Sequence, residues 1–273
     1  MNTLKDHLIL FDAECPMCQL YTKAFVSTGL LGENGRIAYQ EYPVQACPTI
    51  NWQRAVNEIA LVNQATGEVT YGIESLLKIC AAAMPVLRPL FLFKPFVWLM
   101  RKLYAFVSYN RRVIIPAPVT EQSFQFQPSF KKHYRIAYLI FSWLVTAYIL
   151  ATYGKLMTGF LPQASMSREF LVCGGQIAFQ GFVILLYKKE KVWDYLGNLM
   201  TISLAGALLL LPVLISGNWF HFSSDVYFIW FSMVVSLMFL EHLRRSKILQ
   251  LGYLMTLTWV LYRMIVLVVI LNV

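Results

Sequence analysis

The spacing of hydrophobic positions changes near residue 134. Before it, short apolar runs alternate with polar residues, a pattern that predicts strands over residues 7–11, 36–40, 58–63 and 69–71 and helices over 16–28, 52–57, 73–83 and 96–109. After it, the chain is almost continuously apolar. The pattern predicts an α/β domain over residues 1–115, a Pro-, Gln- and Ser-containing linker over 116–133, and an all-α transmembrane bundle over 134–273.

Five apolar blocks approach the roughly 20 residues that a helix needs to cross a bilayer. They cover residues 136–153, 170–187, 195–215, 226–243 and 251–273. A sixth apolar stretch, residues 84–115, is interrupted by three prolines and is too short to span. We expect it to lie on the α/β domain or in the membrane interface.

Composition excludes an ordinary soluble protein. The chain is 58% hydrophobic and only 14% charged, whereas charged residues make up about a quarter of soluble domains. Its net charge of +9 does not indicate nucleic-acid binding, because the basic residues gather at the ends of the apolar blocks. We expect an integral membrane protein with no nucleic-acid partner.

The basic residues also predict an orientation. With five crossings, nine of them flank one side (Lys131, Lys132, Arg135, Lys188, Lys189, Lys191, Arg244, Arg245, Lys247) and two the other (Lys155, Arg168). The positive-inside bias places the N-terminal domain in the cytosol and the C-terminus outside the inner (cytoplasmic) membrane. The first residues have no secretory-signal pattern, which agrees with a cytosolic start.

The main chemical feature is a dithiol, Cys15-Pro16-Met17-Cys18, directly after the first strand and at the start of the first helix. Backbone amides and the helix dipole stabilise a thiolate there, so we expect Cys15 to be an ionised, accessible nucleophile. Cys18 would attack the mixed disulfide that Cys15 forms. Asp12 and Glu14 add opposing negative charge, although Asp12 could relay a proton to or from Cys18. The sequence does not decide which effect is larger.

Two other interpretations of the dithiol remain. Cys47 and Cys80 could complete a four-cysteine zinc site, but they lack the paired spacing of a second half-site, so no metal is expected. A purely structural disulfide is disfavoured in reducing cytosol.

The segment Phe11-Asp12-Ala13-Glu14-Cys15-Pro16-Met17-Cys18 resembles the signature D-x-x-C-x-x-C of the DCC family of thiol-disulfide oxidoreductases. Asp12, Cys15 and Cys18 match that signature. The hairpin up to Tyr71-Gly72 and the segment from Leu103-Tyr104 to Asn110-Arg111-Arg112 are similar to later parts of the family's pattern. The resemblance covers about residues 7–115 and implies a thioredoxin-like fold with redox-active thiols, as does a cytosolic CxxC near a βαβ pattern.

In the membrane half, Arg263 falls about 18 Å along its helix from Leu251, near mid-bilayer. A charge there is costly, so we expect it to face the bundle or a wet cavity, where it could bind an anionic lipid, a quinone oxygen or a carboxylate such as Asp194. Alternatively, the helix shifts and Arg263 reaches the interface. Cys173 is single, which disfavours a transmembrane relay of disulfides.

Three functions remain open. The first is a membrane-anchored thiol-disulfide oxidoreductase that acts on a protein or small-molecule thiol or disulfide partner, without a cofactor. The second is a non-catalytic subunit whose thioredoxin-like head binds a partner in a membrane complex or homo-oligomer. The third is a quinone-linked thiol oxidase, with Arg263 holding the quinone.

Overall fold

The computed structural model describes residues 4–116, 126, 128–160 and 162–272. It divides into two compact units, Met1–Tyr134 and Arg135–Val273, which are described separately. Residues 117–125 and 127 of the predicted linker at 116–133 lie outside the described residues, and its last two residues, Lys132 and His133, already belong to a helix.

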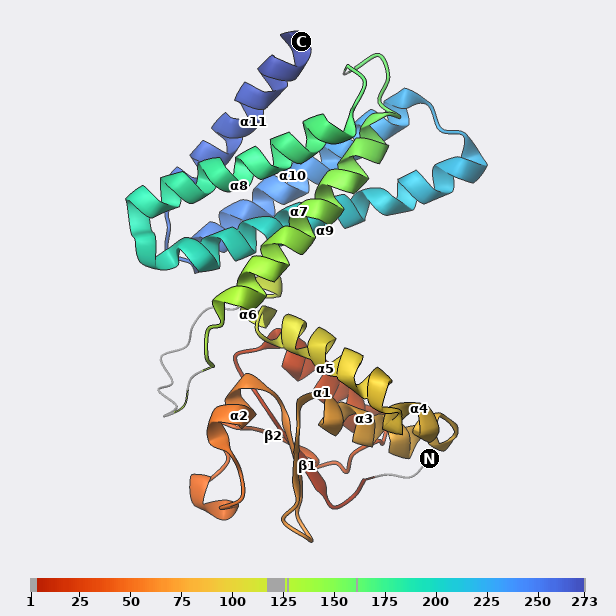
Figure 1. Ribbon diagram of the computed structural model, residues 1–273, viewed down its shortest axis with the longest axis vertical. Helices are drawn as coiled ribbons and strands as arrows, with labels where there is room; N and C mark the ends of the chain where they lie inside the picture. Colours follow the sequence, from red (N-terminus) through yellow and green to blue (C-terminus); the bar gives the residue numbers. More distant parts are fainter. Residues whose placement is uncertain (1–3, 117–125, 127, 161, 273) are drawn as a thin grey trace. The chain divides into compact units, whose positions relative to one another are not determined.

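The first unit is built on a mixed four-stranded sheet (Figure 1). Its strands are β1 (His7–Phe11), β2 (Arg36–Ala38), β3 (Ala60–Asn63) and β4 (Val69–Tyr71), in the order β2-β1-β3-β4. β1 runs parallel to β2 and antiparallel to β3, and β3 is antiparallel to β4. All five residues of β1 are buried, as expected for an apolar central strand.

Helices cover both faces of this sheet. Alternate residues of β1 point to opposite faces, so Leu8 and Leu10 pack with α2 (Trp52–Asn57), whereas Ile9 packs with α1 (Pro16–Ser27) and α3 (Gly72–Ala83). The chain then forms α4 (Arg88–Leu92), α5 (Lys94–Ser108) and α6 (Arg111–Ile114), with short 3₁₀ turns η1 (Val44–Ala46) and η2 (Pro85–Leu87). α5 lies on α3.

The predicted elements of this unit form, with shifted ends. The third strand begins at Ala60 rather than Glu58, because Glu58 caps α2 and donates its backbone N–H to Arg54 O. The second strand ends at Ala38, and Gln40 instead turns its side chain toward Asp12. The hairpin turn has Gly67 at φ +72°, as its sequence predicts.

The second unit is helical: α7 (Lys132–Gly154), α8 (Met166–Lys188), the 3₁₀ turn η3 (Lys189–Lys191), α9 (Val192–Phe220), α10 (Ser224–Ile248) and α11 (Leu254–Asn272). The first turn of α7 belongs to the first unit. Among the described residues, four helical segments are long and apolar enough to cross a membrane, consistent with a multi-pass membrane protein.

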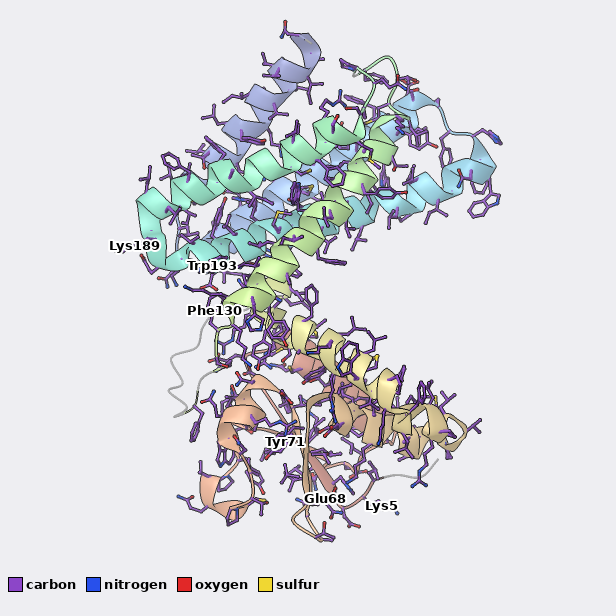
Figure 2. All side chains as sticks on the ribbon, viewed as in Figure 1. Lys5, Glu68, Tyr71, Phe130, Lys189 and Trp193 are labelled. Atoms are coloured by element: carbon purple, nitrogen blue, oxygen red, sulfur yellow. The ribbon has the colours of Figure 1, made fainter. Side chains whose placement is uncertain are left out.

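One of the four segments, Met166–Phe220, is 55 residues long and contains two of the five predicted spans. It turns back on itself at η3, near Lys189 and Trp193 (Figure 2). The hydroxyl of Tyr195 donates a 2.7 Å hydrogen bond to Gln180 Oε1. In a straight helix these residues would be about 22 Å apart, so α8 and α9 form a hairpin.

Polar side chains join the helices of this unit. Tyr195 also lies 3.1 Å from His242 Nε2, and Arg245 Nη1 donates to Asn198 Oδ1 at 2.9 Å. Such bonds satisfy polar groups that lipid cannot. Gln180 and Asn198 therefore connect helices of this unit.

Candidate functional site

The dithiol lies where the chain leaves β1 and enters α1. Cys15 is the N-cap residue of α1, in an extended conformation, and Pro16 occupies the first helical position, where a missing amide costs nothing. The Cys15 sulfur accepts a hydrogen bond from the backbone N–H of Cys18 at 3.3 Å. The thiol thus occupies the place of a capping oxygen, at the positive end of the helix.

Both thiols are buried in a small cluster. Cys15 and Cys18 each expose 4% of their surface and pack with Phe11 and Ala38. This differs from the accessible sulfur expected from the sequence. The capping bond holds the Cys15 sulfur over the first turn of α1, and the partly buried Ala13, Met17 and Tyr21 pack against the cluster.

The two thiols have opposite acidities. A hydrogen bond from the Cys18 thiol lowers the pKa of Cys15 to about 7, with help from the positive charge of Arg111 and against the effect of burial. The same hydrogen bond and burial raise the pKa of Cys18. Asp12 opposes the Cys15 thiolate, but its effect is the smallest of those named, so the cation and the hydrogen bond outweigh the carboxylate.

Asp12 is almost fully buried and surrounded by donors. Arg111 Nη2 lies 2.8 Å from its Oδ2, while Gln40 Nε2 and the backbone N–H of Glu14 donate to Oδ1 at 2.9 and 3.1 Å. These donors hold the carboxylate in one orientation, and Arg112 Nη2 lies a further 3.9 Å from Oδ2.

Arg111 comes from α6, 99 residues after Asp12, and is buried with it. Its guanidinium also donates to Val56 O at 2.9 Å and Asn57 O at 3.3 Å. Burial works against its charge, yet the nearby Cys18, Asp12 and Cys15 raise its pKa overall. Arg111 therefore supplies a permanent positive charge to the site.

Glu14 has its own cation. Arg112 Nη2 lies 3.1 Å from Glu14 Oε2, and the Arg112 side chain is 45% exposed. This pair neutralises Glu14 at the surface, so its charge does not act unopposed on Cys15.

Arg111 and Gln40 are site residues that sequence reasoning did not assign. The signal for Arg111 was its place in the Asn110-Arg111-Arg112 segment, and Tyr104 in the same region also has a role. The Tyr104 hydroxyl accepts a hydrogen bond from the backbone N–H of Ile59 at 3.1 Å. This bond links α5 to the residue that precedes β3. No sequence signal marked Gln40.

The other cysteines do not join the pair. Cys47 lies in a different core cluster, 3.1 Å from Thr49 Oγ1, and Cys80 lies on α3. Within residues 4–116, 126, 128–160 and 162–272, no three His, Cys, Asp or Glu side chains gather as metal ligands do. The four-cysteine zinc set is thus not assembled.

Arg263 lies on α11 and lines a cavity between the membrane helices. Asp194, which the sequence offered as its carboxylate, is instead 3.8 Å from Arg135 Nη1, because it lies in the first turn of α9. The pairing of Arg263 with Asp194 is therefore wrong. The acidic residue beside the Arg263 cavity is Glu169.

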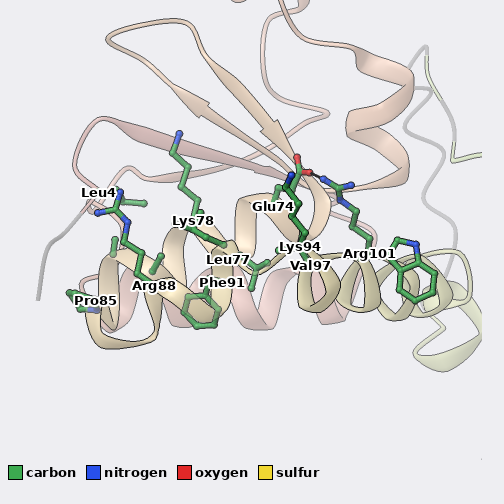
Figure 3. Close-up of a pocket in the computed structure, with 14 residues that line it drawn as sticks. Leu4, Glu74, Leu77, Lys78, Pro85, Arg88, Phe91, Lys94, Val97 and Arg101 are labelled. Atoms are coloured by element: carbon green, nitrogen blue, oxygen red, sulfur yellow. Dashed lines mark hydrogen bonds and ion pairs between the residues drawn. The ribbon is translucent and has the colours of Figure 1, made fainter.

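A groove of about 940 Å³ lies between α3 and the α4–α5 segment (Figure 3). Its walls include Leu77, Phe91 and Val97 together with basic side chains such as Arg88 and Lys94. The dithiol is not among its lining residues, so this groove is separate from the redox candidate.

Comparison of the chain with protein-family models, curated proteins and solved structures finds no match. The chemistry of the site is therefore the basis for a function.

Proposed function

We propose that the chain is a membrane-anchored thiol-disulfide oxidoreductase whose Cys15–Cys18 dithiol reduces or exchanges disulfides on a partner. The observation that carries the proposal is the unequal acidity of the two thiols at the start of α1. A nucleophile with a pKa of about 7 beside a second thiol of raised pKa is the arrangement that dithiol exchange requires.

The arrangement of the first unit supports a thioredoxin-like interpretation. Its sheet order β2-β1-β3-β4, with β1 parallel to β2 and a dithiol after β1, fits a redox domain of that kind. The resemblance of Asp12, Cys15 and Cys18 to the DCC signature leads to the same proposal.

The reaction proceeds in two exchanges. The Cys15 thiolate attacks one sulfur of the partner's disulfide, forms a mixed disulfide and expels the other sulfur as a thiolate. Cys18 then loses its proton and attacks Cys15, which releases the partner as a dithiol and leaves a Cys15–Cys18 disulfide. Two electrons pass to the partner, and the reverse sequence oxidises it.

Asp12 and Arg111 prepare this site. Arg111 stabilises negative charge on sulfur, and Asp12 holds Arg111 in place. In this proposal Asp12 also accepts the proton of Cys18 during the second exchange. Protonation removes the negative charge of Asp12 and so weakens the ion pair between Asp12 and Arg111.

The proposed topology has five crossings, with α8 and α9 counted separately, and a cytosolic redox unit. It is supported by the nine basic residues on one side and two on the other. Reducing cytosol would then regenerate the dithiol.

The decisive test uses purified full-length protein and a disulfide substrate. Cys15→Ser should abolish reductase activity, whereas Cys18→Ser should accumulate the mixed disulfide with its partner. Cys47→Ser is the matched control, because Cys47 is buried but outside the pair. Full turnover by Cys15→Ser would refute the proposal.

The burial of both thiols favours a second candidate, a non-catalytic subunit of a membrane complex. Under the main proposal, side chains around the dithiol must move before a partner reaches Cys15, which is 4% exposed. A Cys15→Ala/Cys18→Ala double variant separates the two: it complements a deletion if the unit only binds, and fails if it catalyses.

A further inference from the structure

A cavity of about 670 Å³ lies within the membrane unit. Residues of α7 through α11 line it, and most of them are apolar, for example Leu210, Val234 and Leu267. A cavity of this size accommodates a substantial part of an amphiphilic molecule.

Three polar atoms in the cavity wall are buried and have no hydrogen-bond partner among the residues that the structure describes: Thr146 Oγ1, Trp259 Nε1 and Arg263 Nε. Two of the three are obligate donors. The Arg263 guanidinium carbon lies 5.5 Å from the centre of the Trp259 ring, so these donors are neighbours. Buried donors of this kind require an acceptor.

The charges of the cavity are unbalanced. Arg168 and Glu169 pair with each other at 2.8 Å. Among the described residues, no carboxylate lies within ion-pair distance of Arg263, which leaves one positive charge in an apolar setting. A charge buried in a membrane normally has a counter-ion.

We propose that this cavity binds an anionic phospholipid. Its phosphate accepts from Arg263 and Trp259, and its acyl chains fill the apolar part of the cavity. The surrounding bilayer supplies such a molecule, with the acceptor oxygens, the negative charge and the apolar body that the wall lacks. A quinone offers acceptors but no charge, so it leaves Arg263 unbalanced. This inference does not depend on the redox proposal.

The test measures thermal unfolding of delipidated full-length protein in neutral detergent. Phosphatidylglycerol should raise the unfolding temperature more than phosphatidylcholine with the same acyl chains, and native mass spectrometry should show it bound. Arg263→Gln should lose this difference. Arg244→Gln is the control, since Arg244 is a half-exposed arginine on α10 that does not line the cavity.

Equal responses to the two lipids in the wild-type protein would overturn the proposal, even if Arg263→Gln failed to fold. So would a retained phosphatidylglycerol effect in Arg263→Gln, or an Arg263-dependent response to a ubiquinone analogue without one to phosphatidylglycerol.

A different observation concerns the α4–α5 segment of the first unit. Large apolar side chains on it face solvent, among them Leu92 at 69% and Trp98 at 61% exposure. Exposed apolar side chains on adjoining helices indicate a surface that another phase or molecule covers.

The charge of this segment identifies what covers it. Residues 88–108 contain four basic residues (Arg88, Lys94, Arg101, Lys102) and no Asp or Glu, and among these Arg101 pairs with Glu74 of α3. An amphipathic helix with aromatic and basic residues lies in the interface of an anionic membrane. The groove in Figure 3 adds Lys78 to the basic residues beside it.

The end of α5 also lies near the start of a membrane helix. The rings of Tyr109 and Tyr134 stack with centres 4.8 Å apart, and Asn110 Nδ2 donates to Tyr134 O at 3.1 Å. Tyr134 is in the first turn of α7, a candidate span.

We infer that the α4–α5 segment rests on the anionic surface of the same bilayer. The test places a nitroxide, attached through p-acetylphenylalanine, at Leu92 or at Leu20 of full-length protein in nanodiscs. Leu20 is the control, an equally exposed leucine on α1. At Leu92 we expect access to oxygen but protection from a water-soluble nickel complex, more so in phosphatidylglycerol than in phosphatidylcholine.

Other results would contradict the inference. Nickel access at Leu92 equal to that at Leu20 means that water covers the segment. Protection from both reagents means that protein covers it. Equal protection of the Leu92 label from nickel in phosphatidylglycerol and phosphatidylcholine means that lipid charge does not contribute to the binding of this segment.

Discussion

Cys15 and Cys18 share the first turn of α1 but meet different electrostatic conditions. The Cys15 sulfur receives hydrogen bonds as the cap of the helix, and Arg111 favours its negative charge. Cys18 is the donor in their mutual bond, and it must give up a proton in a buried setting. The order of attack in the proposed reaction follows from this difference, since the more acidic thiol is the better nucleophile near neutral pH.

The pH dependence of alkylation tests this difference. Because the pKa of Cys15 is lowered from 9.0 to about 7, its reaction with iodoacetamide should accelerate as pH rises through about 7. Cys18→Ala removes the largest cause of the lowered pKa, so the midpoint should rise. The rate is measured by mass spectrometry of the Cys15 peptide. Cys47→Ser should leave the midpoint unchanged, and a wild-type midpoint near 9 would contradict the assignment.

The buried Asp12–Arg111 pair predicts a large effect on stability. Arg111→Met removes the closer, buried cation of the Asp12 carboxylate and leaves only the half-exposed Arg112, 3.9 Å away, which should lower the free energy of unfolding by about 3 kcal/mol. It should also raise the pKa of Cys15, because Arg111 helps to lower it. Denaturant unfolding of the full-length protein and the alkylation midpoint measure the two effects.

Arg112→Met is the matched control. Arg112 is 45% exposed, pairs with Glu14 at 3.1 Å and lies 3.9 Å from Asp12 Oδ2, whose closer cation Arg111 it leaves in place, so its loss should cost less than about 1 kcal/mol. The double variant Asp12→Asn/Arg111→Met should recover part of the stability lost in Arg111→Met. Equal costs for Arg111→Met and Arg112→Met would show that burial of the Asp12 pair has no consequence.

At the scale of elements, the sequence predicted what local pattern determines. The apolar run of β1, Pro16 at the start of α1 and Gly67 in the hairpin each act over a few residues, and these elements formed as expected. The Asp12–Arg111 pair joins residues 99 positions apart. No local periodicity encodes such a contact. The resemblance to the DCC family singled out the Asn110-Arg111-Arg112 segment, but it did not indicate that Arg111 pairs with Asp12.

The same limit applies to the burial of Cys15 and to the partner of Asp194. Residue spacing placed Cys15 at the helix start, but whether its sulfur turns outward depends on the packing of Ala13 and Met17. In the membrane unit, apolar length marked the spans, whereas the partner of Asp194 depended on which helix ends meet.

The turn from β4 into α3 predicts a specific effect of glycine replacement. Gly72 has φ +57°, and an added Cβ would come within 2.5 Å of Glu58 Oε2 and 3.1 Å of Tyr104 Cε1. Gly72→Ala should therefore cost more than the roughly 1–2 kcal/mol of left-handed backbone strain alone.

Gly67→Ala separates strain from crowding. Gly67 has φ +72° and nothing within 4 Å of an added Cβ, so only the strain applies. The difference in unfolding free energy between the two variants measures the crowding against Glu58 and Tyr104. A Gly72→Ala cost no larger than that of Gly67→Ala would show that the turn relaxes freely.

At the scale of the whole molecule, the proposed chemistry requires the redox unit to face a reducing compartment. The hairpin of α8 and α9 determines the orientation of α10 and α11. Lys188, Lys189 and Lys191 lie at its bend, and the proposed topology places them in the cytosol by the positive-inside bias. Under that proposal the helices cross as five spans, and the end of α11 is on the opposite side of the membrane from the dithiol.

Reporter fusions test this orientation in full. Alkaline phosphatase fused after Asn272 should be active, because it folds only outside the cytosol, whereas fluorescent protein at the same place should stay dark. Fusions after Lys247 should give the opposite result, since Arg244, Arg245 and Lys247 end α10 on the basic side. Because one of the two reporters should be active at each position, a silent reporter cannot be explained by lack of expression. If Met166–Phe220 crossed only once, the fusions after Lys247 and Asn272 would exchange their signals. The dithiol would then share a side with the C-terminus, and the assignment of Lys188–Lys191 to the cytosol would be lost.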